Sequence, residues 1–398
     1  MANTIKLGNG TWATKEGSLL AYNDENNNFK PLPFTTTRAS SASVVNKQGL
    51  IETVGSGIPR IDFSDDANGA LLLEPQRTNL IDESNNLTIS WGDYNFGGGN
   101  MTKQFGVLSP DGSNNATRLT YTNTSPGSGG ALLTRNLTLV ANAQYTISFY
   151  AKNVSGIKQI RVDLRNSSSG GVSGSSFTLT NQWKRYTKTV TNNSETNRGL
   201  QFRLNDSEYS GDRTFDVWGI QLEQATYASS VIQTSGTAIT RVADTASGSG
   251  NSTVINSSEG VLYANLSNIK SQNFDSIVIN NGIVDENNTV RIWFYNNTIT
   301  YQYKVGSATS AQIASGTIDL TSDTKIACSW KLNEFKLFVN GLQRGVTDTS
   351  GSVLANGTLE SVQFKRGNNT GNFYGKTKDL KLYNTALTDA ELTTLTTL

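Results

Sequence analysis

The sequence predicts an all-β protein in which two antiparallel β-sandwiches follow an irregular N-terminal segment. Apolar residues make up 36% and charged residues 16% of the chain, and Asn, Ser, Thr and Gly are abundant. Asn, Ser and Thr are poor in helix interiors because their side chains compete for backbone hydrogen bonds, whereas Thr and aromatic residues suit strands. Short alternating runs separated by Gly/Ser/Asn clusters are typical of sandwiches. A length of 398 residues suits two cores with additional segments.

The N-terminal segment is predicted over residues 1–78. All six prolines lie within the first 126 residues, and the breakers GNG, NDENNN and GSGIP interrupt residues 1–78. Proline cannot donate to a central strand ladder, so the continuous sheets should lie later in the chain. We expect residues 1–78 to attach to, or wrap around, another body.

The first sandwich is predicted over residues 79–245. In IKQIRVDLR, the apolar side chains should face the core and the charged side chains the opposite face, since strand side chains alternate. YTISFYAK and GLQFRLND repeat this pattern. In FDVWGIQLE we expect Trp218, Ile220 and Leu222 to share the core face.

The second sandwich is predicted over residues 246–398, after a Gly/Ser-rich linker at 245–260. Two hairpin turns are predicted at Asn296-Asn297 and Asn340-Gly341, because Asn and Gly tolerate the positive φ that such turns need. Thr388 and Glu391 match a capping box. A short helix is therefore predicted from Asp389 to about Thr396.

Two sequence segments near the C-terminus resemble the concanavalin A-like, laminin-G-type sandwich family. They are KIACSWKLNEFKLFVNGLQRG (325–345) and GKTKDLKLYNTALTDAEL (375–392). Residues 79–245 look like a jelly-roll carbohydrate-binding module, chiefly through the closing phrase FDVWGIQLEQATYASSVIQTSG. The first of these resemblances implies that the C-terminal sandwich binds sugars, binds proteins or fills space.

Three upstream phrases are similar to a signature of fibre and receptor-binding proteins of tailed phages. They are TRASSAS (37–43), IPRIDF (58–63) and LLLEPQRTNLI (71–81). This resemblance implies a virion protein, with other virion proteins (capsid or tail) as partners of the N-terminal region. It also favours a homo-oligomer, with a trimer as the preferred state.

Charge and composition exclude several function classes. The net charge is +1 without runs of like charge, so nothing favours nucleic acid or an anionic membrane as a partner. The chain has no histidine, which removes Ser-His-Asp and Cys-His nucleophile pairs and His general bases. Cys328, the single cysteine, lies in an apolar run and is interpreted as a buried packing thiol.

The N-terminus lacks a cationic segment followed by an apolar core, so we expect no secretory signal. No apolar run approaches the length of a membrane span. We therefore expect a virion-surface protein that is made in the bacterial cytoplasm and released by lysis.

Five aromatic residues are candidates for a glycan platform, because the apolar face of a pyranose stacks on an aromatic ring. They are Trp91, Trp183 and Tyr186 in the first sandwich and Trp293 and Tyr295 in the second. Each competes with the alternative that the ring belongs to the core. Trp293 and Tyr295 should share the face opposite Ile292 and Phe294, and are also a candidate subunit contact. Trp218 and Trp330 are predicted to be core residues.

Arginines and carboxylates recur inside the phage-like phrases and are predicted to hold loops onto a sandwich by bidentate pairing, with catalysis as the less favoured reading. The set is Arg38, Arg60, Asp62, Glu74, Arg77, Arg241 and Asp244. No cofactor is expected to be required, although oxygen-rich loops leave room for one structural calcium ion. Its candidate ligands are Asp206, Asp212, Asp319 and Asp323.

The resulting hypothesis is a non-enzymatic phage head or tail fibre protein that displays glycan-binding sandwiches for adhesion to the host surface. The first alternative is a capsid or tail decoration protein that makes only protein contacts. The alternative of a different class is a glycan-degrading tail-spike enzyme, which would need two carboxylates facing each other about 5–10 Å apart. No motif in the sequence selects such a pair.

Overall fold

The computed structural model describes residues 3–398 except for a set of short gaps. The gaps are 16, 23, 25–26, 28–31, 89, 97, 124–129, 157–158, 167–171, 193–195, 205–210, 271–273, 283–285 and 367–369. Strands account for 56% and helix for 2%. The all-β prediction is confirmed, with antiparallel sheets throughout.

The chain forms two compact units. The first sandwich consists of residues 50–52 and 76–241, and the second of residues 1–49, 53–75 and 242–398. The predicted division into 1–78, 79–245 and 246–398 therefore needs correction, because residues 1–49 and 53–75 do not form a body of their own.

The first sandwich packs two five-stranded sheets, counted over the described residues, around one apolar core. One sheet has the order β10 (Gly92–Phe96), β13 (Gly130–Thr138), β18 (Asn197–Leu204), β15 (Gln159–Asn166) and β16 (Val172–Thr178). The other has the order β11 (Gly99–Val107), β12 (Ala116–Asn123), β19 (Gly211–Glu223), β14 (Gln144–Ser155) and β17 (Lys184–Thr191). The short strands β9 (Arg77–Asn79) and β20 (Ile239–Arg241) pair with each other.

Strand β19 departs from simple alternation at Gly219. This residue has φ of 63°, and the register of β14 against β19 shifts between Ser148 and Tyr150. Ile220 belongs to the core cluster, whereas Trp218 lies edge-on against Tyr150. The prediction that Trp218 shares the face of Ile220 was wrong, because an inserted residue reverses the facing of the strand. Trp218 is nevertheless fully buried, as predicted.

The second sandwich contains an eight-stranded and a nine-stranded sheet within the described ranges. The first runs β29 (Leu342–Asp348), β28 (Glu334–Val339), β27 (Thr324–Lys331), β22 (Gly260–Ser267), β31 (Gly375–Tyr383), β8 (Ala70–Leu73) and β7 (Ile61–Asp62), with β1 (Ile5–Gly8) also on β31. The second runs β2 (Ala13–Lys15), β3 (Ser18–Leu20), β4 (Pro33–Thr37), β21 (Thr245–Ser249), β30 (Ser361–Gln363), β23 (Asp275–Asn280), β24 (Thr289–Tyr295), β25 (Thr298–Val305) and β26 (Ala308–Thr317). β5 (Ala42–Val45) and β6 (Ile51–Val54) pair with each other.

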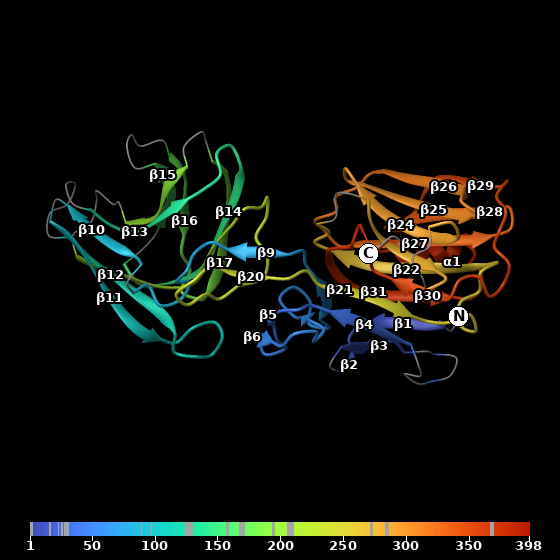
Figure 1. Cartoon of the computed structure of the whole chain (residues 1–398), viewed down its shortest axis with the longest axis horizontal. Coiled ribbons are helices and arrows are strands. Elements are labelled where there is room, and N and C mark those ends of the chain that lie inside the picture. The colour runs from blue at the N-terminus through green and yellow to red at the C-terminus, as the bar shows by residue number, and fades with distance from the viewer. Residues whose placement is uncertain are drawn as a thin grey trace. The chain divides into compact units, whose positions relative to one another are not determined.

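The N-terminal strands complete both sheets of the second sandwich (Figure 1). β31 pairs with β8 along its first residues and with β1 along its last residues. β21 pairs with β4 on one side and β30 on the other, so the stretch predicted as a linker at 245–260 begins with a sheet strand. These strands are two to five residues long. Strands of this length are too short to be recognised by an alternation of apolar and polar residues. Their position in the sheets is set by pairing with longer strands.

Local sequence signals in the second sandwich are confirmed. Asn296 and Asn297 have φ of 46° and 57° between β24 and β25, and Asn340 and Gly341 have φ of 51° and 78° between β28 and β29. Helix α1 (Asp389–Thr396) carries the predicted capping box at its N-terminus. Trp330 and Cys328 are fully buried, and burial raises the pKa of the Cys328 thiol. Among the described residues no helix has the length and apolarity needed to cross a membrane.

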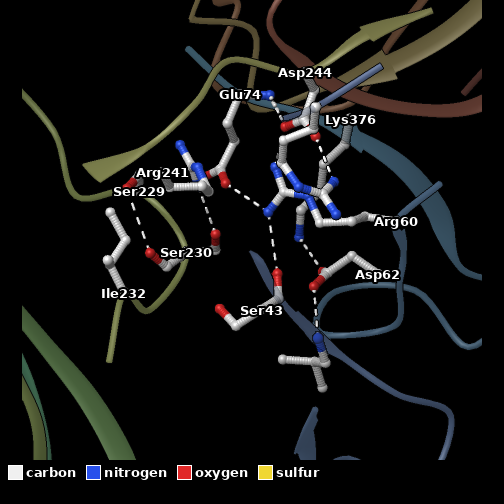
Figure 2. Close-up of polar contacts among 12 residues, drawn as sticks. Ser43, Arg60, Asp62, Glu74, Ser229, Ser230, Ile232, Arg241, Asp244 and Lys376 are labelled. Carbon is white, nitrogen blue, oxygen red and sulfur yellow. Dashed lines mark hydrogen bonds and ion pairs between the residues drawn. The ribbon is translucent and has the colours of Figure 1, made fainter. Parts of the chain in front are cut away.

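A buried ion-pair network ties the N-terminal segments to the start of β21. Figure 2 shows Arg60 between Glu74 and Asp244. Arg60 Nη1 lies 2.8 Å from Glu74 Oε2 and donates to the Ser43 carbonyl, while Nη2 donates to Asp244. Arg38 Nη1 lies 2.9 Å from the other oxygen of Asp244. Burial alone would lower the pKa of Arg60, but the charges of Glu74 and Asp244 raise it above its ordinary value. The network is therefore charged and internally balanced.

A second buried pair joins β7 to β31. Lys376 Nζ lies 2.8 Å from Asp62 Oδ1 and 2.7 Å from Ser64 Oγ. Burial by itself would raise the pKa of Asp62. The charge and hydrogen bond of Lys376 and the hydrogen bond of Ser64 have the larger effect, so the pKa of Asp62 is lowered. Sequence reasoning selected Asp62 and missed Lys376, whose position opposite Leu72 arises only from pairing of β31 with β8.

We predict that Arg60→Met destabilises the second sandwich alone. Removing one partner of a buried ion pair leaves the other charges buried without compensation. This lowers the free energy of unfolding by about 3–5 kcal/mol. For a unit of this size that loss lowers the melting temperature by roughly 6–20 °C. Calorimetry should show one of two transitions shifted, with Lys47→Met, at an exposed site of the same unit, unchanged. Equal melting of Arg60→Met and the wild type would contradict the role given to this network.

Candidate functional site

Two of the five predicted platform residues lie in the core of the first sandwich. Trp91 is 2% exposed, and its Nε1 donates to the Glu83 carbonyl at 2.9 Å. Tyr186 is 7% exposed and stacks on Phe149. Stacking on a sugar needs an accessible ring face, so these two residues are corrected to packing roles. Their neighbours in sequence are polar, which disguised their burial.

Trp183 is half-buried at the start of β17. Lys152 Nζ lies 5.1 Å from the centre of its ring, and Lys152 also approaches the buried carboxylate of Asp216. Arg118 binds the same carboxylate through two nitrogens, at 2.7 and 3.1 Å. One face of Trp183 is thus occupied by a cation, and no other aromatic ring among the described residues packs against it.

The second sandwich brings Trp293 and Tyr295 together with a third ring. Phe274 stacks on Tyr295, with ring centres 4.6 Å apart and an angle of 4° between the planes. Trp293 meets Phe274 edge-on, with a centre distance of 5.7 Å. Phe274 and Tyr295 are each 41% exposed, while Ile292 and Phe294 on the opposite face of β24 are fully buried. We call Phe274, Trp293 and Tyr295 the aromatic patch.

The backbone of Phe274 has an unusual conformation that brings its ring into the patch. Its φ is 60°, a region that a bulky residue rarely adopts and that costs of order 1–3 kcal/mol. Ser276 Oγ donates to the Phe274 carbonyl at 2.7 Å, and Ser276 N donates to Gly371 O at 3.0 Å. These bonds hold the turn that lays the Phe274 ring over Tyr295. Sequence analysis missed Phe274 because this residue precedes β23 and is not part of an alternating apolar and polar pattern.

Polar groups extend the aromatic patch along β24 and its neighbours. The Arg291 guanidinium lies 4.2 Å from the centre of the Trp293 ring, and Arg291 Nη2 donates to Gln302 Oε1 at 2.8 Å. Gln302 Nε2 in turn donates to Gln312 Oε1 at 2.8 Å. Burial, together with the nearby charge of Arg366, lowers the pKa of Arg291 to about 10, so the guanidinium remains charged at neutral pH. The patch is therefore bordered by a fixed cation and amide groups.

The first sandwich offers a polar sheet face that sequence reasoning described only as outward-facing. Strand register aligns two rows across all five strands of the β10–β16 sheet. One row is Gly92, Thr134, Gln201, Asp163 and Gly174, and the next is Tyr94, Leu132, Arg203, Arg161 and Ser176. Tyr94 is 59% exposed. We call this surface the polar sheet face.

Asp163 organises the polar sheet face. Its buried carboxylate lies 2.8 Å from Arg161 Nε and 3.4 Å from Arg203 Nη1, so it holds two partly exposed guanidinium groups in place. A Cβ at Gly174 would lie 1.7 Å from Asp163 Oδ1, which means the carboxylate occupies the space over this glycine. Gln201 Oε1 is buried and has no hydrogen-bond partner among the described residues. The face presents donors on both guanidiniums, an acceptor amide and an exposed phenol.

Two of the four calcium candidates, Asp319 and Asp323, have side chains that the structure describes, and both already have protein partners. Asp319 accepts from Thr321 and Ser322, and these bonds lower its pKa to about 2. Asp323 pairs with Lys378 at 2.8 Å. Asp206, and the side chain of Asp212, lie outside the described residues. Within the described part of the chain no three Cys, Asp or Glu side chains gather in a metal-binding group.

The remaining predicted arginines belong to the first sandwich. The Arg77 guanidinium lies 5.1 Å from the centre of the Tyr227 ring, and Arg241 Nη1 donates to Ser230 Oγ at 2.7 Å. Arg77 and Arg241 are directly paired between β9 and β20. Both arginines thus fix chain segments, without a place in either candidate surface.

Comparison with protein families finds one match for each sandwich. Residues 84–211 match a carbohydrate binding domain family, and residues 262–393 match the concanavalin A-like lectin/glucanases superfamily. The polar sheet face lies wholly in the first range and the aromatic patch wholly in the second. The chain thus contains a carbohydrate-binding domain and a concanavalin A-like domain. Comparison with curated proteins gives no match.

Several solved structures are distantly similar. The CBM40 module of the Ruminococcus gnavus IT-sialidase, bound to alpha2,3 sialyllactose, has 16% identity and a TM-score of 0.33 over 38% of this chain and 94% of that chain. The family 11 carbohydrate-binding module of Clostridium thermocellum, in complex with a beta-1,3-1,4-mixed-linked tetrasaccharide, has 15% identity and a TM-score of 0.29 over 40% and 97%. The enzymatically active domain of bacteriophage CBA120 tailspike protein 4 has 13% identity and a TM-score of 0.28 over 36% and 21%. Similarities at this level do not bear on function.

The burial difference between Trp91 and Trp183 generates a prediction. Trp91→Ala should cost about 3–5 kcal/mol, because it empties a core position. Trp183→Ala should shift the melting temperature of the first sandwich by only a few degrees, since the residue is only half-buried. Calorimetry of the two variants checks this. Comparable losses in both would show that Trp183 is a packing residue as well.

Proposed function

We propose that this protein is a non-enzymatic fibre-type virion protein of a tailed phage that adheres to glycans on the host surface. The single observation that carries the adhesion proposal is the aromatic patch, in which exposed rings of Phe274 and Tyr295 stand beside the Trp293–Arg291 pair. Large apolar side chains exposed together on a sheet face are a feature of binding surfaces rather than of ordinary solvent-facing strands.

The chemistry of the patch suits a saccharide. The C–H face of a pyranose can lie on the outward face of Tyr295 or Phe274, while the hydroxyl groups at its edge meet polar neighbours. Thr298 lies directly opposite Tyr295 on β25, and Thr300 lies opposite Trp293. Their hydroxyls provide donors and acceptors along the same side of the sheet.

The polar sheet face is proposed as a second glycan-binding surface, on the carbohydrate-binding domain. Arg161 and Arg203 carry two positive charges against the single negative charge of Asp163. A guanidinium donates in a planar fork to a carboxylate or to paired hydroxyls, so this surface favours glycans that bear acidic groups. Two surfaces on one chain raise avidity through effective concentration.

The virion assignment is supported by the phage-like phrases of the sequence. Arg38, Arg60 and Glu74 come from these phrases, and all three serve the buried network that holds the N-terminal strands. We propose that exposed parts of the N-terminal strands contact other virion proteins. Adhesion without catalysis is proposed because the chain has no histidine and no motif pairs two carboxylates. Release of reducing ends from host polysaccharide would instead favour the tail-spike enzyme.

We predict that Tyr295→Ala weakens binding to host cells or their purified surface polysaccharide by about tenfold, equivalent to about 1.4 kcal/mol. The melting temperature should stay within a few degrees, because the ring is partly exposed. Leu398→Ala, an exposed apolar truncation in the same unit and outside β29, is the matched control and should bind normally.

The polar sheet face is tested in parallel with Arg203→Met. Loss of binding in this variant alone would assign adhesion to the first sandwich and remove the aromatic patch from the proposal. Normal binding by both Tyr295→Ala and Arg203→Met would reject glycan adhesion at these surfaces.

One observation favours the decoration alternative, in which the sandwiches make only protein contacts. Leu332, Leu342 and Val346 are 59%, 59% and 82% exposed near the edge strand β29. An exposed apolar edge strand is a ready surface for pairing with another chain. This edge is also a reasonable subunit contact in a fibre.

We predict a homo-oligomer, most simply a trimer, by light scattering at micromolar concentration. A double variant with Leu342→Lys and Val346→Lys should shift the mass toward the monomer without lowering the melting temperature, since neither side chain is buried. A monomeric wild-type protein would contradict the oligomer prediction. A stable oligomer that binds no glycan would move the decoration role to first place.

A further inference from the structure

A polar cavity of about 300 Å³ lies on the outer face of the eight-stranded sheet of the second sandwich, beside helix α1. Its floor comes from β22, β27 and β31, and its rim from α1 and two N-terminal loops. The lining residues are Asn9, Asp66, Asn68, Tyr263, Asn265, Lys325, Lys378, Asp379, Lys381, Thr394 and Leu395. Neither glycan surface proposed above shares a residue with this cavity.

Strand alternation and register place the floor residues together. Leu262 and Leu380 point into the core, so Asn265 and Asp379 lie on the outer face. Asn265 is directly paired with Asp379 on one side and with Lys325 on the other. Three polar side chains from strands more than 50 residues apart in sequence therefore form one row across the sheet.

Two oxygen atoms in this row lack hydrogen-bond partners. Asn265 Oδ1 and Asp379 Oδ1 are both buried and unpaired among the described residues. Asp379 is 6% exposed, and its other oxygen binds Lys381 Nζ at 2.7 Å. Burial raises the pKa of Asp379, although Lys381 opposes this shift. A buried acceptor without a donor costs about 1–3 kcal/mol, so the row favours a molecule that supplies donors.

The cations around the cavity already have partners. Lys325 Nζ donates to the Thr397 carbonyl at 2.6 Å, and Lys378 pairs with Asp323 at 2.8 Å. Lys381 binds Asp379 and lies 5.2 Å from the centre of the Tyr263 ring. The three ammonium groups that line the cavity disfavour a metal ion or an amine as its occupant. Neutral hydroxyl groups remain as the donors that fit two adjacent oxygen acceptors.

We propose that this cavity binds one neutral pyranose unit, with a vicinal pair of its hydroxyls donating to Asn265 Oδ1 and Asp379 Oδ1. Leu395 supplies an apolar wall for the C–H face of the ring. The volume falls at the lower end of the range for small-molecule sites, which suits one sugar ring better than a chain. The site extends the proposed glycan-binding function to a second mode, recognition of a terminal residue, and it needs neither of the other surfaces.

The test is saturation-transfer NMR on the full chain with methyl glycosides of glucose, galactose and mannose. We expect transfer from at least one glycoside. Asn265→Ala should weaken its affinity about five- to tenfold through the lost hydrogen bond. Thr394→Trp, which fills the cavity from the exposed side of α1, should abolish transfer when it is combined with Tyr295→Ala, because the aromatic patch then no longer contributes. The matched control is Thr393→Trp, one residue away on the same helix and outside the cavity, which should leave transfer intact.

Melting temperatures of all three variants identify any that fail to fold. Tyr295→Ala and Arg203→Met should keep glycoside binding, which separates this site from the two surfaces proposed above. Absence of transfer from all three glycosides would show that the cavity holds water only and would overturn the inference. Equal transfer in Thr394→Trp and Thr393→Trp, each combined with Tyr295→Ala, would overturn it as well, while leaving adhesion through the other surfaces untouched.

Discussion

The second sandwich depends on the burial of the Arg60 guanidinium between Glu74 and Asp244. A charge that leaves water must be paired and hydrogen-bonded, and here Asp244 meets this need for Arg38 as well. The three short strands β1, β4 and β8 could not hold an order by themselves. The ion-pair network and the pairing with β21 and β31 place β4 inside the nine-stranded sheet and join β8 and β1 to β31 of the eight-stranded sheet. Without these strands, β21 and β31 would expose unpaired backbone.

That constraint determines what the outer faces can become. Once the N-terminal strands complete the eight-stranded sheet, Asn9 and the loop around Asp66 form part of the rim of the cavity beside α1. The N-terminal strands β2, β3 and β4 likewise extend the nine-stranded sheet. In this sheet, β24 carries Trp293 and Tyr295 on the side that faces away from the core. Regular sheets carry these exposed side chains, and a site on such elements loses less conformational entropy on binding than a site on loops.

Ionised groups serve different ends in the two units. In the second sandwich the paired charges are buried and hold segments together, as Lys376 and Asp62 do. In the first sandwich, by contrast, the buried carboxylate of Asp163 positions two guanidiniums that remain partly in solvent. The same residue types therefore hold chain segments together when both partners are covered, and leave hydrogen-bond donors in solvent when only the carboxylate is covered.

The sequence by itself determined the all-β class, the two hairpin turns, the capped C-terminal helix and the burial of Trp330 and Cys328, because each depends on local propensity or alternation. Tertiary structure alone decided the rest. It joined residues 1–49 and 53–75 to residues 242–398, buried Trp91 and Tyr186, and brought Phe274 onto Tyr295. Strands of a few residues, a bulge at Gly219 and the row that joins Asn265 to Asp379 all depend on which distant strands pair. Such pairings cannot be recognised from a repeating pattern in the sequence, because the paired residues are far apart in the chain.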